Sequence, residues 1–150
     1  MISKNSSIHK SAKIGKGVKI GDYCVIGESV EVGDYCKIHN SVTISGNTKI
    51  GKNNTFYPFC SIGSNPQDLK FKGEISFLEI GSENIFREYC NISLGTEHGG
   101  FKTIIGSNSL YMVGCHVGHD CKMGDRLVIA NNVAIAGHCE FENDVILGGN

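Results

Sequence analysis

Three histidines and one aspartate in the second half of the chain are the residues best suited to chemistry. His116, His119 and His138 fall within 23 residues, and Asp120 follows His119 directly. A carboxylate next to an imidazole can fix its tautomer, so that the histidine serves as a general base. Three histidines can instead bind a metal ion such as zinc. Surface histidines without a task are a third interpretation, and the spacing alone leaves all three open.

The elements that would position these residues follow a period of six. Two series of large apolar residues show it, Ile8, Ile14, Ile20, Ile26, Val32, Ile38, Ile44, Ile50, Phe56, Ile62, Ile80, Phe86 and Ile92, then Ile105, Tyr111, Val117, Met123, Ile129, Ile135, Phe141 and Leu147. This period fits neither a helix nor a single strand, so it indicates a repeat protein. A smaller residue usually follows four positions later, which predicts a three-sided prism of short parallel strands around stacked side chains.

The same repeat brings the candidate residues together. His116 precedes the inward Val117 by one residue and His119 follows it by two, so both emerge around one edge of a coil. His138 lies 19 residues beyond His119, close to the 18 residues of a three-sided coil, and is expected one coil further on. The three side chains could therefore converge.

Two interruptions of the period predict external loops on a single domain that spans residues 1–150. The apolar series is lost between Gly63 and Phe77, and its phase slips by one residue between Ile92 and Ile105. We expect loops near residues 64–77 and 95–103. Loops on a rigid scaffold often carry binding groups. The second loop, with glycines at positions 95, 99 and 100, is expected to be flexible.

Composition narrows the function classes. The net charge of −1 provides no basic stripe, so we expect no nucleic-acid partner. No apolar run approaches the length of a membrane span, and the first residues lack the apolar core of a secretory signal. The sequence therefore favours a cytoplasmic protein. All seven cysteines occupy the small inward position, which predicts reduced packing residues rather than disulfides or metal ligands.

Several motifs together resemble one family. They are the hexapeptide series, Asn65-Pro66-Gln67-Asp68-Leu69-Lys70, Phe86-Arg87-Glu88, Cys115-His116-Val117-Gly118-His119-Asp120-Cys121, Ala130-Asn131-Asn132 and Ile135-Ala136-Gly137-His138. The whole chain resembles the UDP-N-acetylglucosamine O-acyltransferases of lipid A biosynthesis. A related N-acyltransferase of the same pathway typically has asparagine after the catalytic histidine, so Asp120 favours the O-acyltransferase.

The resemblance implies a fold, an assembly and a reaction. The fold would be a left-handed parallel β-helix, an exception to the usual right-handed crossover. The assembly would be a homotrimer with active sites between subunits. The reaction would move a 3-hydroxyacyl group from acyl carrier protein to the 3-hydroxyl of UDP-N-acetylglucosamine. Neither a cofactor nor a metal ion is implied.

The resemblance also implies catalytic roles for three residues. His119 would be the general base that removes the proton of the sugar hydroxyl, and Asp120 would hold His119 in place. The amide N–H of Gly137 would stabilise the oxyanion of the tetrahedral intermediate.

Five further residues match substrate-binding positions of the family. His116 and His138 would contact the sugar, and Gln67, Asp68 and Lys70 would contact the substrate from the first loop. For Lys70 the alternative interpretation is a solvated surface charge.

Two features depart from the family pattern. Ser93 and Leu94 stand where the family commonly has a histidine or asparagine and an arginine. The chain also ends in the middle of a repeat, where the family continues through further coils and a helical domain. We therefore expect the parts that contact the nucleotide and measure the acyl chain to be absent, as in a fragment or a truncated gene product.

Two other functions compete with the acyltransferase. One is a zinc enzyme of the γ-carbonic-anhydrase type, with His116, His119 and His138 or their neighbours across a trimer interface as ligands to the metal. The other is a trimeric scaffold without catalytic activity.

Overall fold

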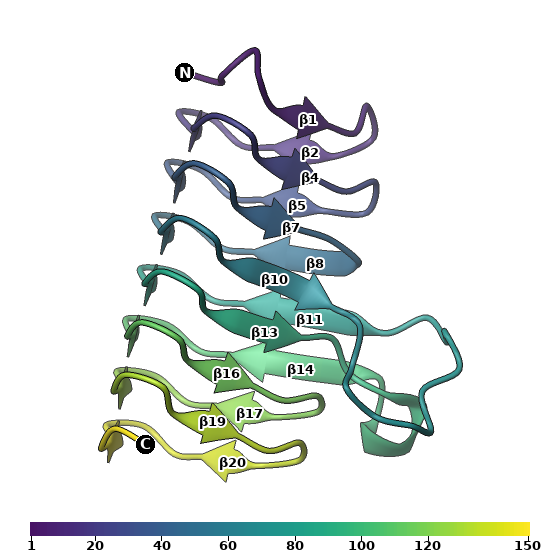
Figure 1. The fold of residues 1–150 in the computed structure, drawn as a ribbon, viewed down its shortest axis with the longest axis vertical. Helices are drawn as coiled ribbons and strands as arrows, with labels where there is room; N and C mark the ends of the chain where they lie inside the picture. Colours follow the sequence, from purple (N-terminus) through teal and green to yellow (C-terminus); the bar gives the residue numbers. More distant parts are fainter.

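The computed structural model describes residues 1–150, which wind into a three-sided prism of stacked coils (Figure 1). Its strands form three parallel sheets of seven strands each. Each coil contributes one strand to each sheet in turn, and each strand pairs with the strands three places away in the order. The parallel β-helix predicted from the period of six is confirmed.

The three sheets are named here after their first strands. The β1 sheet contains β1 (Ser7–Ile8), β4 (Val25–Ile26), β7 (Thr43–Ile44), β10 (Ser61–Ser64), β13 (Asn91–Ser93), β16 (His116–Val117) and β19 (Ala134–Ile135). The β2 sheet contains β2 (Lys13–Ile14), β5 (Glu31–Val32), β8 (Asn47–Ile50), β11 (Phe77–Ile80), β14 (Lys102–Ile105), β17 (Lys122–Met123) and β20 (Glu140–Phe141). The β3 sheet contains β3 (Lys19–Ile20), β6 (Lys37–Ile38), β9 (Thr55–Phe56), β12 (Ile85–Phe86), β15 (Leu110–Tyr111), β18 (Val128–Ile129) and β21 (Ile146–Leu147).

The interior consists of side chains stacked from coil to coil. The rings of Phe56, Phe86 and Tyr111 stack with centroids 4.9 Å apart at each step, close to the spacing of paired strands. A single apolar cluster runs from Val18 to Ile135. One continuous core therefore holds the coils in register.

Asn54 lies inside the prism because its side-chain amide forms hydrogen bonds to the backbone of the next coil. We call the series of such bonds along this corner a polar ladder. The amide of Asn54 donates to the Gly81 carbonyl at 2.8 Å, and its oxygen accepts the backbone N–H of Asn84 at 3.0 Å. Asn84 repeats the pattern with Gly106 and Ser109, both at 2.9 Å. Buried amides are stable here because donor and acceptor are both satisfied.

The cysteines are packing residues in the structure. All seven are free, and all but the half-buried Cys139 are buried. Burial raises the pKa of Cys121 to about 11, so its thiol stays protonated and poorly reactive at neutral pH.

Both interruptions of the period emerge at one corner, between the β1 and β2 sheets, which we call the loop corner. The first excursion, residues 65–76, connects β10 to β11, and the second, residues 94–101, connects β13 to β14 (Figure 1). The second contains the only helix, the 3₁₀ turn η1 (Glu97–Gly99). No helix in the structure has the length and apolar character needed to cross a membrane.

Candidate active site

The candidate residues lie at the loop corner, in the coils that follow the two excursions. His119 and Asp120 form the turn between β16 and β17, and Gly137 and His138 form the equivalent turn between β19 and β20. The backbone N–H of His138 donates to the His119 carbonyl at 2.9 Å, which stacks the two turns. The predicted juxtaposition of His119 and His138 in successive coils is present in the structure.

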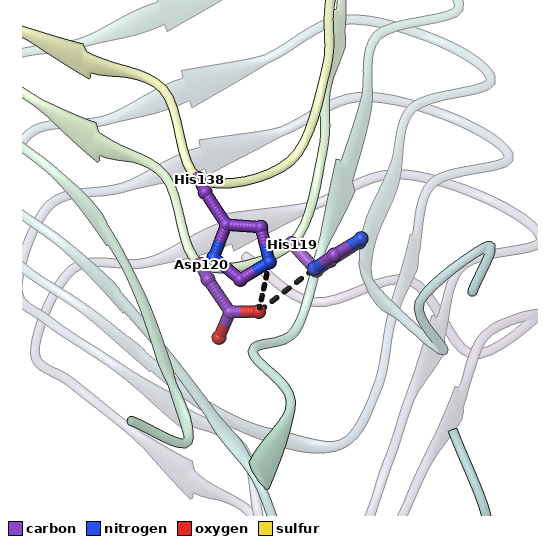
Figure 2. Close-up of side chains that lie close together, drawn as sticks. All are labelled: His119, Asp120 and His138. Carbon is purple, nitrogen blue, oxygen red and sulfur yellow. Dashed lines mark hydrogen bonds and ion pairs between the residues drawn. The ribbon is translucent and has the colours of Figure 1, made fainter. Parts of the chain in front are cut away.

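His119 and Asp120 form a tight hydrogen-bonded pair (Figure 2). Nδ1 of His119 lies 2.7 Å from Oδ2 of Asp120, whose side chain is fully buried. His138 stands edge-on to His119, with ring centroids 5.0 Å apart, and its Nε2 is 3.8 Å from the same carboxylate oxygen. An ionised carboxylate only accepts, so we assign the proton to Nδ1 of His119. Its Nε2 then carries the lone pair that a general base needs.

Gly137 packs directly against the His119 ring. A Cβ atom at this position would lie 2.6 Å from Nε2 of His119, so a side chain here would collide with the imidazole. The backbone N–H of Gly137 donates to no acceptor within the chain. It is therefore free to bind an oxygen atom close to the base.

His116 does not join this group. Its Nδ1 lies 2.7 Å from Oδ1 of Asn91 in the preceding coil, and burial, with a smaller contribution from the charge of His119, lowers its pKa. The ligand atoms that lie within 4.8 Å of one another belong to His119, Asp120 and His138. Within one chain, therefore, the side chains of the three histidines do not converge on a single point.

The predicted residues of the first excursion lie outside the hydrogen-bonded group. Asp68 is half-buried, whereas Gln67 and Lys70 are exposed. The backbone N–H of Lys70 donates to Asp68 at 2.9 Å and is the main reason that the pKa of Asp68 is lowered. The charge of His119 lowers it as well, so the Asp68 carboxylate is within electrostatic range of the imidazole.

Two threonines that the sequence analysis did not single out hold Asp120. Thr96 donates its backbone N–H to Oδ1 at 2.7 Å and its hydroxyl to Oδ2 at 2.6 Å. The hydroxyl of Thr103 accepts the backbone N–H of Asp120 at 2.8 Å. The period of six does not distinguish either threonine from other residues. The only sequence feature that pointed to this region was the break in the period at the second excursion.

Ser93 and Leu94, the two residues that depart from the family pattern, place an apolar side chain at the loop corner. Leu94 is buried, and a Cβ at Gly46 would lie 2.6 Å from its side chain. The buried hydroxyl of Ser93 has no hydrogen-bond partner. This corner therefore packs through apolar contacts, without the charge that the family pattern would supply.

Comparisons with known proteins agree with the fold and the motifs. Residues 1–34 match the bacterial transferase hexapeptide model of six repeats. The acyl-[acyl-carrier-protein]–UDP-N-acetylglucosamine O-acyltransferase of Herminiimonas arsenicoxydans is 46% identical over 149 residues, which are 99% of this chain and 57% of that protein. The corresponding protein of Paracoccus denitrificans is 54% identical over 93 residues, 62% of this chain and 36% of that one.

A solved structure is similar to this chain in both fold and sequence. The UDP-N-acetylglucosamine O-acyltransferase of Moraxella catarrhalis superimposes with a TM-score of 0.98 at 47% identity, over 99% of this chain and 58% of that one. The chain is thus similar over almost its whole length to UDP-N-acetylglucosamine O-acyltransferases. The expected left-handed parallel β-helix is confirmed. The chain spans a little under three fifths of the length of the Herminiimonas relative.

Proposed function

We propose that this chain carries the catalytic machinery that moves a 3-hydroxyacyl group from acyl carrier protein to the 3-hydroxyl of UDP-N-acetylglucosamine, the first step of lipid A biosynthesis. One observation carries the proposal. His119 is tied through Nδ1 to a buried carboxylate at 2.7 Å, and its Nε2 lies beside the free amide of Gly137. A base next to an oxyanion donor is the minimal requirement for acyl transfer to a hydroxyl.

The proposed reaction proceeds through a tetrahedral intermediate. Nε2 of His119 takes the proton of the sugar hydroxyl as its oxygen attacks the thioester carbonyl carbon. The negative charge that develops on the carbonyl oxygen is stabilised by the N–H of Gly137. The intermediate then collapses, the carbon–sulfur bond breaks, and protonated His119 returns the proton to the departing thiolate of the carrier protein. The Asp120 carboxylate stabilises the imidazolium between the two transfers.

Substrate positioning is assigned to the residues around this pair. His138 lies beside His119, and His116 lies on the neighbouring strand β16, where both would contact the sugar. Gln67, Asp68 and Lys70 would contact the substrate from the first excursion. The exposed ammonium of Lys70 suits a phosphate oxygen of the nucleotide sugar.

A homotrimer in the cytoplasm completes the proposal. The outward face of the β3 sheet supports assembly, because Ile85 and Ile146 leave 42% and 75% of their area exposed there. Phe59 and Tyr89 also stack at the surface, with ring centroids 5.1 Å apart. Exposed apolar groups of this kind are typical of surfaces that pair with another copy. Sedimentation velocity would measure the assembly.

The test is acyl transfer by this chain, with and without a metal chelator, compared with a His119→Ala variant. We expect kcat to fall about 10²- to 10⁴-fold in the variant, the range for loss of a general base. Chelation should leave the wild-type rate unchanged. His9→Ala is the matched control, because His9 occupies the loop corner of the first coil, far from the site.

Three outcomes would contradict the proposal. Activity that survives His119→Ala would remove His119 from the mechanism. Loss of activity on chelation would favour the zinc enzyme. A trimer that neither transfers the acyl group nor binds the nucleotide sugar would favour the scaffold.

A further inference from the structure

The buried carboxylate of Asp120 depends on the second excursion for most of its hydrogen bonds. Its three bonds within 3 Å come from the hydroxyl and the backbone N–H of Thr96 and from Nδ1 of His119. A fully buried carboxylate is costly unless its oxygens are satisfied. Thr96, 24 residues earlier in the chain, therefore supplies two of the three donors.

The excursion is folded so that it closes over this carboxylate. The carbonyl of Thr96 accepts the backbone N–H of Phe101 at 2.7 Å and that of Gly99 at 3.2 Å, which curls the segment around Thr96. A Cβ atom at Gly99 would lie 1.9 Å from Cγ of Asp120, so only glycine permits this approach. The excursion thus covers Asp120 on the side that His119 leaves open.

The hydroxyl of Thr96 also helps to set which oxygen of the Asp120 carboxylate faces His119. It donates to Oδ2, the same oxygen that His119 contacts at 2.7 Å and that His138 approaches at 3.8 Å. The backbone N–H of Thr96 holds Oδ1 at the same time, so the carboxylate cannot rotate about its Cβ–Cγ bond without losing a hydrogen bond. The carboxylate plane is thereby fixed with Oδ2 toward His119.

We propose that Thr96 is a positioning residue for acyl transfer. It holds Asp120 in the orientation that keeps the proton of His119 on Nδ1 and leaves Nε2 free as the base. The second excursion is on this view an orienting device for the catalytic pair. This inference rests on the proposed function, since it assigns His119 as the general base.

Thr96→Val tests the proposal, because valine keeps the shape and the backbone N–H but lacks the hydroxyl. We expect kcat to fall roughly 10- to 100-fold, the effect of losing one hydrogen bond to a charged group. KM for the nucleotide sugar should stay within about twofold, since no substrate contact changes. Thr96→Ser restores the donor and should bring kcat back to within a few-fold of wild type.

Thr48→Val is the matched control. Thr48 is also a buried threonine, on β8 two strands from Thr103, and its hydroxyl donates to the Ser45 carbonyl at 2.6 Å rather than to the catalytic pair. The variant loses one buried hydrogen bond without altering Asp120. It should therefore reduce the melting temperature about as much as Thr96→Val does, while kcat stays at the wild-type value.

A second measurement needs no substrate. The ¹⁵N resonances of His119 report which ring nitrogen carries the proton, and we expect the Nδ1–H form in the wild type and a mixture with the Nε2–H form in Thr96→Val. Unchanged resonances in Thr96→Val together with a wild-type kcat would overturn the proposal. An equal loss of kcat in Thr48→Val would overturn it too, because the effect would then be structural. If the wild type transfers no acyl group, the proposed function fails, while the resonances still decide whether Thr96 fixes the tautomer.

Discussion

The two excursions leave the prism at the same corner but use their polar residues in opposite ways. In residues 65–76, Gln67 and Lys70 are exposed, and Asp68 accepts a hydrogen bond from the backbone two residues later. In residues 94–101, Thr96 is buried and bonds to Asp120, 24 residues further along the chain. The first excursion thus keeps Gln67 and Lys70 in water, whereas the second places Thr96 inside the protein.

This difference corresponds to two tasks of one site, the capture of a substrate and the orientation of a catalytic carboxylate. Groups that must capture a substrate have to remain available, so a solvated loop suits them. A group that orients a catalytic carboxylate works best when it is rigid and dry, because a hydrogen bond is electrostatically stronger away from water. The comparison predicts that changes in the second excursion affect kcat and changes in the first affect KM.

The largest effect is expected for Gly99→Ala. The added Cβ would collide with Cγ of Asp120, a carboxyl group that Thr96 holds through two hydrogen bonds. Either the excursion or the carboxylate must shift, and we expect kcat to fall about 100-fold, as for a misplacement of about 1 Å at a catalytic group. Steady-state kinetics would measure the change.

Gly148→Ala is the control for that substitution. A Cβ at Gly148 meets no atom within 4 Å, so the variant should behave as wild type. Wild-type kcat in Gly99→Ala would show that the close approach of the second excursion to Asp120 does not matter for catalysis, and the contrast between the two excursions would be lost.

A smaller and different effect is expected for Lys70→Ala in the first excursion. The exposed ammonium makes no ion pair within the protein, so its removal should leave the catalytic pair intact. We expect KM for UDP-N-acetylglucosamine to rise about tenfold with kcat nearly unchanged, the pattern for a binding contact of equal strength in ground and transition states.

Lys72→Ala provides the comparison within the same loop. Lys72 is also exposed, two residues further on, and matches no substrate-binding position. Its removal should leave KM within about twofold of wild type. Equal changes in the two variants would indicate a general effect of loop charge and would remove the specific role of Lys70.

The prism could be predicted from the sequence because stacking imposes its own rule. Every coil must bury one large and one small residue on each side, so the period of six follows directly from the geometry. The same rule predicted that His119 and His138 would lie in successive coils. Even Asn54, which breaks the apolar pattern, keeps its inward place through the ladder with Asn84 and Ser109.

The hydrogen bonds that Thr96 donates to Asp120 could not be predicted from the period of six. An excursion has no period, and its path is set by a few hydrogen bonds, such as those that close on the Thr96 carbonyl. Its glycines suggested flexibility, whereas Gly99 is required by the close approach to Asp120. The sequence also did not predict the hydrogen bond of His116 to Asn91 in the preceding coil, which sets the direction of its ring.

The smallest expected effect concerns His116. Its side chain is half-buried, less exposed than Lys70 of the first excursion and less buried than Thr96 of the second. Burial and the charge of His119 lower its pKa, so the unfolded chain binds a proton more readily than the folded chain does. Folding stability should therefore fall as the pH falls below about 6.5, the value of an unperturbed histidine. In His116→Gln this contribution is absent, and the loss of stability between pH 7.5 and pH 5.5 should be smaller than in the wild type.

Urea unfolding at the two pH values would measure the effect. The difference between the two values is the informative quantity, because any loss of packing in His116→Gln applies at both and cancels. A half-buried, neutral His116 would behave as a hydrogen-bonding group toward the sugar rather than as a cation. If the free energy of unfolding depended on pH identically in the two proteins, His116 would be as solvated as the exposed side chains of the first excursion.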